Sequence, residues 1–152
     1  MVLVLDTSAL YSMEDLPEGC VCPPGVIREL ERHGDQRLGL WGDLLQVSDH
    51  THDSLLTVQS AAKGSGDDAR LSPTDASVIA LAIDLGGTVL TDDYSIQNVC
   101  AILGVPYMAV GAKGIKKIIK WDYQCVGCGK RQKTQMPECP ICGSSMRSRR
   151  RK

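Results

Sequence analysis

The 152-residue sequence lacks the features of membrane-spanning and secreted proteins. No apolar run approaches the roughly 20 residues that a bilayer-spanning helix needs. The first residues, Met1 to Asp6, contain neither a basic stretch nor a small-residue cleavage site, so we expect no signal peptide. These absences favour a cytoplasmic protein that does not act at a membrane.

The sequence also lacks a pattern for covalent catalysis. No Ser-His-Asp or Cys-His arrangement is present, so water is the expected attacking group if the protein is a hydrolase. The three histidines lack ligand spacing with other candidate metal ligands. Three of the seven cysteines, Cys20, Cys22 and Cys100, fall in apolar segments, and we interpret them as buried core residues.

The net charge of −1 hides a strong asymmetry along the chain. Residues 1–112 carry 16 acidic and 5 basic residues, a net charge of −11. Residues 113–152 carry 12 basic and 2 acidic residues, a net charge of +10. This division indicates two modules with different roles. The basic module suits a polyanion such as nucleic acid, and the alternative is a solvated charged tail.

Apolar strand-like segments alternate with helix-like segments over the first 110 residues. This alternation predicts an α/β fold with a parallel sheet and helices on both faces. We expect the glycine-rich segment 63–70 to be a mobile loop. The predicted strands cover 2–5, 19–22, 44–47, 88–91 and 106–110, and the predicted helices cover 26–32, 52–62, 73–85 and 95–103.

Acidic residues gather where these strands end and the helices begin. Asp6 follows the first strand, Asp92 and Asp93 follow the fourth, Asp75 opens the helix before it, and Glu29 lies after the second. If the first and fourth strands are neighbours, the acids converge at one edge of the sheet. Carboxylates held close together favour a hard divalent cation, Mg²⁺ or Mn²⁺, which can activate water for phosphodiester cleavage. Taken singly, each acid except Asp6 is as readily explained as a helix cap, a turn or a surface residue.

Two matched CxxC pairs lie in the basic part of the chain. Cys125 and Cys128 form the first pair, and Cys139 and Cys142 the second. Four thiolates suit one tetrahedral structural Zn²⁺ better than a redox role. A module of about 30 residues is too small to fold on a hydrophobic core, so zinc would supply the missing folding energy.

Basic and aromatic residues surround these cysteines. Phosphates attract lysine and arginine, and aromatic rings can stack on bases. Trp121 and Tyr123 have an equally good alternative as packing residues of the ribbon. We expect residues 147–152 to form a basic tail. The candidate RNA-binding residues are Lys116, Lys117, Lys120, Trp121, Lys130, Arg131 and Lys133.

The first 110 residues resemble the PIN-domain nucleases. The resemblance rests on Val-Leu-Asp6-Thr-Ser8, Pro24-x-x-x-x-Glu29, Thr74-Asp75 and Leu-Thr91-Asp92-Asp93. It implies a five-stranded parallel sheet and an endoribonuclease for single-stranded RNA that depends on Mg²⁺ or Mn²⁺. It also implies that Asp6, Glu29, Asp75 and Asp93 are metal ligands, with Asp92 as an alternative to Asp93, and that Ser8 supports the site.

The order of modules resembles the Nob-type endonucleases of ribosome biogenesis. We expect a nuclease domain at 1–110, a basic linker at 111–120, a zinc ribbon at 121–145 and a basic tail at 146–152. The resemblance implies cleavage of small-subunit precursor rRNA at its mature 3′ end, on the pre-ribosomal small subunit. Two alternatives stay open: a ribonuclease acting on tRNA or mRNA in a toxin-like or quality-control role, and a non-catalytic RNA-binding assembly factor.

Overall fold

The apolar run near the N-terminus forms β1 (Leu3–Leu5), the central strand of a five-stranded parallel sheet. The computed structural model describes residues 2–13, 15–34, 44–111, 120–133 and 135–150. The strand order is β3-β2-β1-β4-β5, so β1 and β4 are neighbours. Leu5 lies opposite Leu90, which brings the carboxyl ends of these two strands level. The other strands are β2 (Cys20–Cys22), β3 (Gln46–Val47), β4 (Thr88–Leu90) and β5 (Tyr107–Met108).

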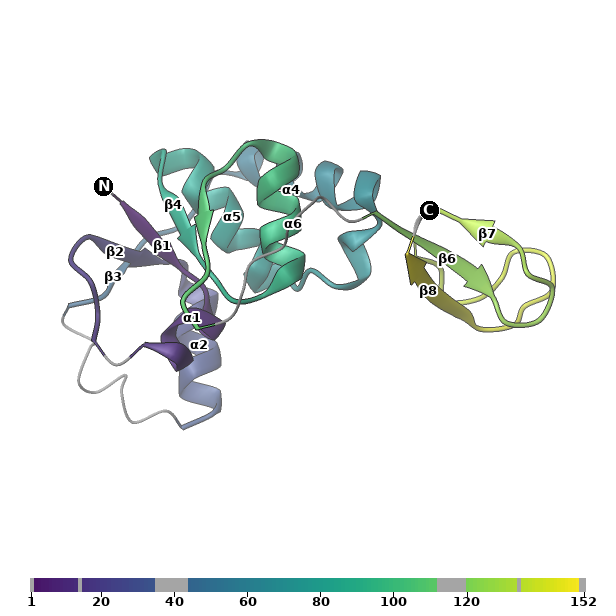
Figure 1. Cartoon of the computed structure of the whole chain (residues 1–152), viewed down its shortest axis with the longest axis horizontal. Helices are drawn as coiled ribbons and strands as arrows, with labels where there is room; N and C mark the ends of the chain where they lie inside the picture. Colours follow the sequence, from purple (N-terminus) through teal and green to yellow (C-terminus); the bar gives the residue numbers. More distant parts are fainter. Residues whose placement is uncertain (1, 14, 35–43, 112–119, 134, 151–152) are drawn as a thin grey trace.

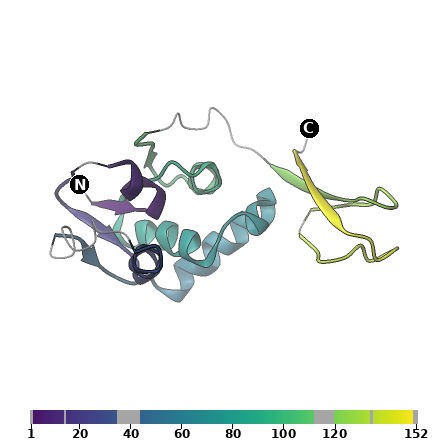
Figure 2. The same ribbon diagram turned by 90° about the horizontal axis from the view of Figure 1, so that it is seen from below.

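Helices flank this sheet and confirm the expected α/β fold (Figures 1 and 2). Helix α5 (Pro73–Leu85) begins at the N-cap Ser72 with proline in its first turn and ends at Gly86 in the left-handed conformation. Its apolar side chains, including Val78, Ile79 and Leu81, are fully buried. The other helices are α1 (Thr7–Ser12), α2 (Pro24–Arg32), α4 (His52–Ser65) and α6 (Tyr94–Leu103).

The segment 63–70, expected to be a mobile loop, is folded and partly buried. Helix α4 continues to Ser65, and a 3₁₀ turn, η1 (Asp67–Ala69), follows it. Gly66 ends α4 with φ 82°, a left-handed conformation that glycine adopts without strain. Ser65 and Asp67 are buried, so the mobile-loop expectation was wrong here.

The basic part of the chain forms a three-stranded antiparallel sheet with the order β7-β6-β8. Its strands are β6 (Trp121–Cys125), β7 (Arg131–Gln132) and β8 (Met146–Arg150). The basic tail expected from residue 146 is therefore, up to Arg150, a strand paired with β6 along its length. This ribbon lies at one end of an elongated molecule, beyond α4 and η1 (Figures 1 and 2). No helix among the described residues is long and apolar enough to cross a membrane.

Candidate active site and zinc ribbon

Asp6 is the most buried of the candidate site acids, with 3% of its surface exposed. It follows β1 directly and is the N-cap residue of α1. Its Oδ2 atom accepts hydrogen bonds from the Ser8 hydroxyl at 2.6 Å and the Thr91 hydroxyl at 2.8 Å. Burial raises the pKa of Asp6 and the two hydroxyl groups lower it, while the neighbouring Asp93 carboxylate raises it further.

Thr91 links the ends of β1 and β4. Its side chain is fully buried, and its Oγ1 atom accepts the Asp93 backbone N–H at 3.0 Å while donating to Asp6. The buried Gln97 side chain donates to the Thr91 carbonyl at 2.9 Å and stabilises the turn between β4 and α6. Sequence reasoning quoted Thr91 within a motif but did not select it as a site residue. Thr91 could have been selected from its position, because it directly follows a predicted buried strand, as Asp6 does.

The two adjacent acids after β4 have different environments. The Asp92 carboxylate accepts hydrogen bonds from the Ser12 hydroxyl at 2.7 Å and the backbone N–H groups of Val110 and Gly111 at 2.7 and 3.0 Å. Asp92 therefore ties β4 to α1 and to the chain after β5. Asp93 caps α6 by accepting the Ser95 N–H at 2.8 Å, and its charge acts on Asp6 and Asp75.

Asp75 combines a structural and an electrostatic role. Its Oδ2 atom accepts the Ser72 N–H at 3.0 Å, and its own N–H donates to the Ser72 hydroxyl at 3.1 Å, a reciprocal capping box. Burial, opposed by the Ser72 backbone hydrogen bond and reinforced by the charges of Asp6 and Asp93, raises the pKa of Asp75 to about 7. A capping role alone would not raise the pKa, since an acid at a helix N-terminus is normally stabilised in its charged form.

Glu29 joins the site through Thr7. The Thr7 hydroxyl donates to Glu29 Oε2 at 2.5 Å, and Thr7 directly follows Asp6. The half-buried Glu29 lies on α2, which closely approaches the start of α5: a Cβ on Gly25 would meet the Thr74 hydroxyl at 2.8 Å. Helix α2 thereby carries Glu29 toward the edge where β1 and β4 end.

The donor set of these acids fits a hard divalent cation. The charge of Asp93 raises the pKa of Asp6, and the charges of Asp6 and Asp93 raise the pKa of Asp75; a cation would relieve this repulsion. Among the described residues, no three of the acids have carboxylate oxygens that all lie within 4.8 Å of one another. Mg²⁺ tolerates this wider spacing, because it usually keeps several waters and binds one or two carboxylates directly.

The four cysteines of the ribbon lie much closer together. Their sulfur atoms all lie within 4.8 Å of one another, and none is in a disulfide. The Cys125–Cys142 and Cys128–Cys139 sulfur pairs are 3.3 and 3.6 Å apart. In a tetrahedral site with Zn–S bonds of roughly 2.3 Å, the sulfurs lie about 3.8 Å apart, so this cluster fits zinc.

Backbone N–H groups donate hydrogen bonds to two of these sulfur atoms. Gly127 and Cys128 donate to the Cys125 sulfur at 3.2 and 3.4 Å, and Ile141 donates to the Cys139 sulfur at 3.4 Å. Hydrogen bonds from the Ser144 hydroxyl and backbone lower the pKa of Cys142 to about 6. At Cys128, a backbone hydrogen bond from Lys130 lowers the pKa, but the neighbouring cysteine thiols raise it to about 11. Thiolates are the form that binds zinc.

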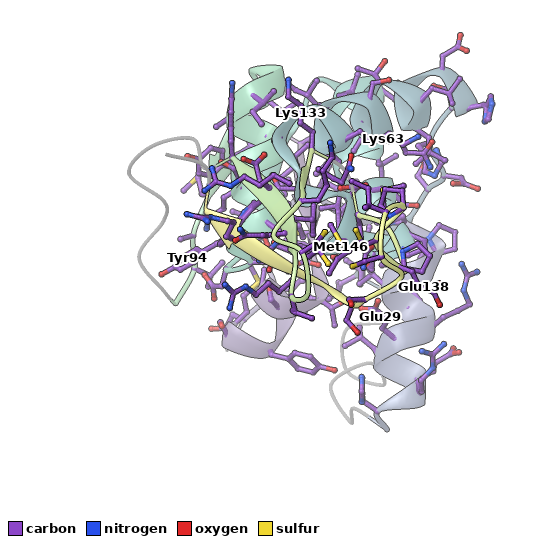
Figure 3. All side chains as sticks on the ribbon, turned by 90° about the vertical axis from the view of Figure 1, so that its right-hand side faces the viewer. Glu29, Lys63, Tyr94, Lys133, Glu138 and Met146 are labelled. Atoms are coloured by element: carbon purple, nitrogen blue, oxygen red, sulfur yellow. The ribbon has the colours of Figure 1, made fainter. Side chains whose placement is uncertain are left out.

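The candidate RNA-binding residues do not share one environment. Lys120, Lys130, Arg131 and Lys133 are exposed, and Figure 3 shows Lys133 on the ribbon that faces the viewer. Lys116 and Lys117 lie outside the described residues. Trp121 is half-buried, and the Arg70 guanidinium covers one face of its ring. Sequence reasoning missed Arg70, because nothing in the sequence places it against a residue 51 positions later.

Comparison with known proteins agrees with this geometry. Residues 3–85 match the family described as the PIN domain of ribonuclease. The chain is 37% identical over 149 residues to "Endoribonuclease Nob1" of Pyrococcus abyssi, covering 95% of this chain and 91% of that protein. It is 35% identical to "Endoribonuclease Nob1" of Archaeoglobus fulgidus, covering 98% and 91%.

A third relative carries a different name. "Ribonuclease VapC1" of Thermoplasma acidophilum is 37% identical over 151 residues, covering 97% of this chain and 77% of that protein. All three names describe ribonucleases. Two of them are Nob1 endoribonucleases, the type that the order of nuclease domain and cysteine cluster in this chain resembles. The chain therefore belongs to the PIN-domain ribonucleases, and within them to the Nob1 endoribonucleases, which makes it a metal-dependent endoribonuclease.

Proposed function

We propose that the protein cleaves small-subunit precursor rRNA at its mature 3′ end during ribosome biogenesis in the cytoplasm. The observation that carries the nuclease part is the edge where β1 and β4 end, with Asp6, Asp75 and Asp93 in mutual repulsion and Glu29 held by Thr7. The two relatives named Nob1, each matched over nine-tenths of its length, support a role in ribosome biogenesis, and the resemblance to the Nob-type endonucleases implies the substrate.

The proposed catalytic role of each acid follows from its surroundings. Asp6, Glu29, Asp75 and Asp93 would hold Mg²⁺ or Mn²⁺, which when bound supplies positive charge that activates water and stabilises the leaving oxygen. The Ser8 and Thr91 hydroxyls both donate to Asp6 Oδ2, which fixes the orientation of that carboxylate toward the proposed cation. Asp92 is not assigned to the metal, because its hydrogen bonds join three parts of the fold.

The zinc ribbon would hold the RNA. Gln124 on β6 lies opposite Arg131 on β7 and Arg147 on β8, so the three side chains share one face of the sheet. Arg149 shares this face, because its guanidinium donates to the Gln124 side-chain oxygen at 2.9 Å. We call Arg131, Arg147 and Arg149 the arginine face. Three arginines around one glutamine form a surface suited to the phosphates of an RNA backbone.

A second candidate substrate is tRNA or mRNA, the target of a toxin-like ribonuclease. The similarity to the protein named VapC1 over 97% of this chain keeps this possibility open. The two candidate functions differ in how selective the enzyme is for its RNA. A precursor-processing enzyme should cut at one position in a pre-rRNA fragment and leave unrelated RNAs intact.

Mapping the cleavage positions distinguishes between precursor rRNA and tRNA or mRNA as the substrate. The full chain would be incubated with Mn²⁺ and a precursor fragment spanning the 3′ end of the small-subunit rRNA, with tRNA and an mRNA as competitors. We expect one cut at the mature 3′ end that disappears without Mn²⁺ and in Asp6→Asn. Cleavage of tRNA or mRNA at a higher rate than the precursor would overturn the proposed substrate while leaving the nuclease intact.

A further inference from the structure

The zinc ribbon is docked on the nuclease domain through the turn that follows α4. Tyr123 of β6 is 3% exposed, and its hydroxyl donates to the Gly66 carbonyl oxygen at 2.5 Å. Gly66 lies at the end of α4, 57 positions earlier in the chain. A buried tyrosine hydroxyl that donates to a backbone carbonyl oxygen fixes both the distance and the direction of approach of β6.

The fit at Gly66 leaves no space for a side chain. A Cβ atom on Gly66 would overlap the backbone carbonyl oxygen of Trp121, the first residue of β6. Gly66 also has φ 82°, which a residue with a side chain adopts only with strain. Two separate requirements for glycine therefore coincide at the point where the ribbon meets the nuclease domain.

Arg70 holds the ribbon at a second point. The central carbon of its guanidinium group lies 3.6 Å from the centre of the Trp121 ring, a cation–π contact. Its Nη2 atom also donates to the Ser148 hydroxyl on β8 at 2.9 Å. One side chain of the nuclease domain thus contacts two strands of the ribbon. Tyr123 lies opposite Ser148 in the β6–β8 register, so both face the same side of the ribbon.

The docking turn is anchored to the helix that Asp93 caps. Asp67 is fully buried, and its Oδ2 atom accepts from the Ser65 hydroxyl and the Asn98 side-chain amide, both at 2.6 Å. Asn98 lies on α6, which begins after Asp93. Burial raises the pKa of Asp67, and these two donors oppose that shift. The turn that receives the ribbon is therefore joined by the Asn98–Asp67 hydrogen bond to α6, the helix that Asp93 caps.

We propose that Arg70 is a positioning residue: with Tyr123 and Gly66 it holds the zinc ribbon in one orientation, so that RNA bound to the ribbon meets the acidic site in a single register. Because strand neighbours alternate between faces, fixing Tyr123 and Ser148 against the nuclease domain also fixes the orientation of the arginine face on the opposite side of the ribbon. The register half of the proposal rests on the proposed function, and the orientation half does not.

The orientation half is tested by ¹⁵N relaxation of the zinc-loaded full chain. We expect amides of the ribbon and of the nuclease domain to share one rotational correlation time. The double variant Arg70→Gln/Tyr123→Phe should lose this shared value, with a shorter correlation time for the ribbon. Lys63→Gln removes one exposed positive charge near the same turn and should change nothing. Retention of the shared value in the double variant, or its absence in the wild type, would overturn the proposal.

The register half is tested by mapping product ends and by kinetics. On precursor RNA, the double variant should spread cleavage over neighbouring positions and raise KM. On a short single strand that reaches only the acidic site, kcat should stay unchanged. Unchanged product ends in a variant whose ribbon moves freely would overturn the register. If the wild type does not cut the precursor, the proposed function fails, and the relaxation data still decide the orientation.

Discussion

The Thr91 hydroxyl donates a hydrogen bond to Asp6 Oδ2 at 2.8 Å, although 85 positions separate the two residues in the sequence. This bond is buried, and the same hydroxyl oxygen accepts the Asp93 N–H. Thr91 therefore sets the relative position of two proposed metal ligands from neighbouring strands. Its role is to orient carboxylates, and it touches neither the cation nor the RNA in this account.

Replacing Thr91 with valine keeps the shape of the side chain and removes this bond. A hydrogen bond to a charged group contributes about 1.5–3 kcal/mol, so cleavage by Thr91→Val should fall roughly 10- to 100-fold. Thr88→Val, the same change at the start of β4, is the matched control and should keep nearly full activity. Initial rates at saturating Mn²⁺ test this, and equal rates for the two variants would contradict it.

Substitution of Asp92 should mainly lower stability, whereas substitution of Asp93 should mainly lower cleavage activity. Asp92→Asn weakens the acceptor for the Ser12 hydroxyl and two backbone N–H groups, so its melting temperature should fall, at a cost of about 1–3 kcal/mol. At temperatures where it stays folded, it should still cut RNA. Asp93→Asn should keep its melting temperature within a few degrees and lose cleavage. Calorimetry and cleavage on the same samples decide, and the opposite pattern would reassign the metal ligand to Asp92.

The raised pKa of Asp75 predicts a pH-dependent stability in the absence of divalent metal. The folded-state pKa is about 7 and the ordinary value is 3.8, so the folded protein holds this proton more tightly than the unfolded chain. Stability is therefore lost as pH rises through this window, and it is unaffected below it. Asp75→Asn cannot ionise and should be more stable than wild type at pH 8 by about 1–2 kcal/mol, after allowance for solvent screening.

Thermal melts of both proteins in a chelator, from pH 4 to pH 8, measure this difference. It should shrink toward zero at the acid end. Added Mn²⁺ should stabilise the wild type at pH 8 and leave Asp75→Asn nearly unchanged, because the cation relieves the repulsion among the acids. A variant that is less stable than wild type across the whole range would indicate that Asp75 serves mainly as a helix cap.

The cysteine cluster predicts one tightly bound Zn²⁺ per chain. Cys125→Ser removes one of four ligands and should release zinc and unfold the ribbon, since so small a module depends on its metal. The five-stranded sheet has its own core and should keep its melting transition. Metal analysis and ¹⁵N spectra of wild type and variant test this. Metal-free wild type with the four cysteines in disulfides would refute it.

The sequence was sufficient for the parts of the fold that are specified locally. The apolar run before Asp6 predicted the strand that β1 forms, and the predicted helix 73–85 has the same bounds as α5. The placement of Asp6 and Asp93 at one edge needed only the neighbouring position of β1 and β4, which the structure supplies. Helix α1 was missed, because six residues between Thr7 and Ser12 carry no cap or periodic pattern strong enough to detect.

The parts that could not be predicted depend on contacts between distant residues. The Lys63–Arg70 segment has the composition of a loop, and its order comes from Asn98 and Tyr123, which lie far away in the sequence. Strand β8 has arginines where a predicted strand would have apolar residues, and pairing with β6 defines it. The distinction between Asp92 and Asp93 also depends on partners, Ser12 and Val110, that sequence spacing does not reveal.

The central claim is that the acidic domain cuts RNA and the basic ribbon holds it. It is tested most directly by the salt dependence of RNA affinity for two proteins, the full chain and residues 1–112, both carrying Asp6→Asn so that the RNA stays intact. The full chain should bind tightly with a steep salt dependence. The shorter protein should bind far more weakly, with the slope reduced by about one unit for each phosphate that the ribbon no longer neutralises. Equal affinity and equal slope for the two proteins would contradict the account and assign the ribbon to protein contacts instead.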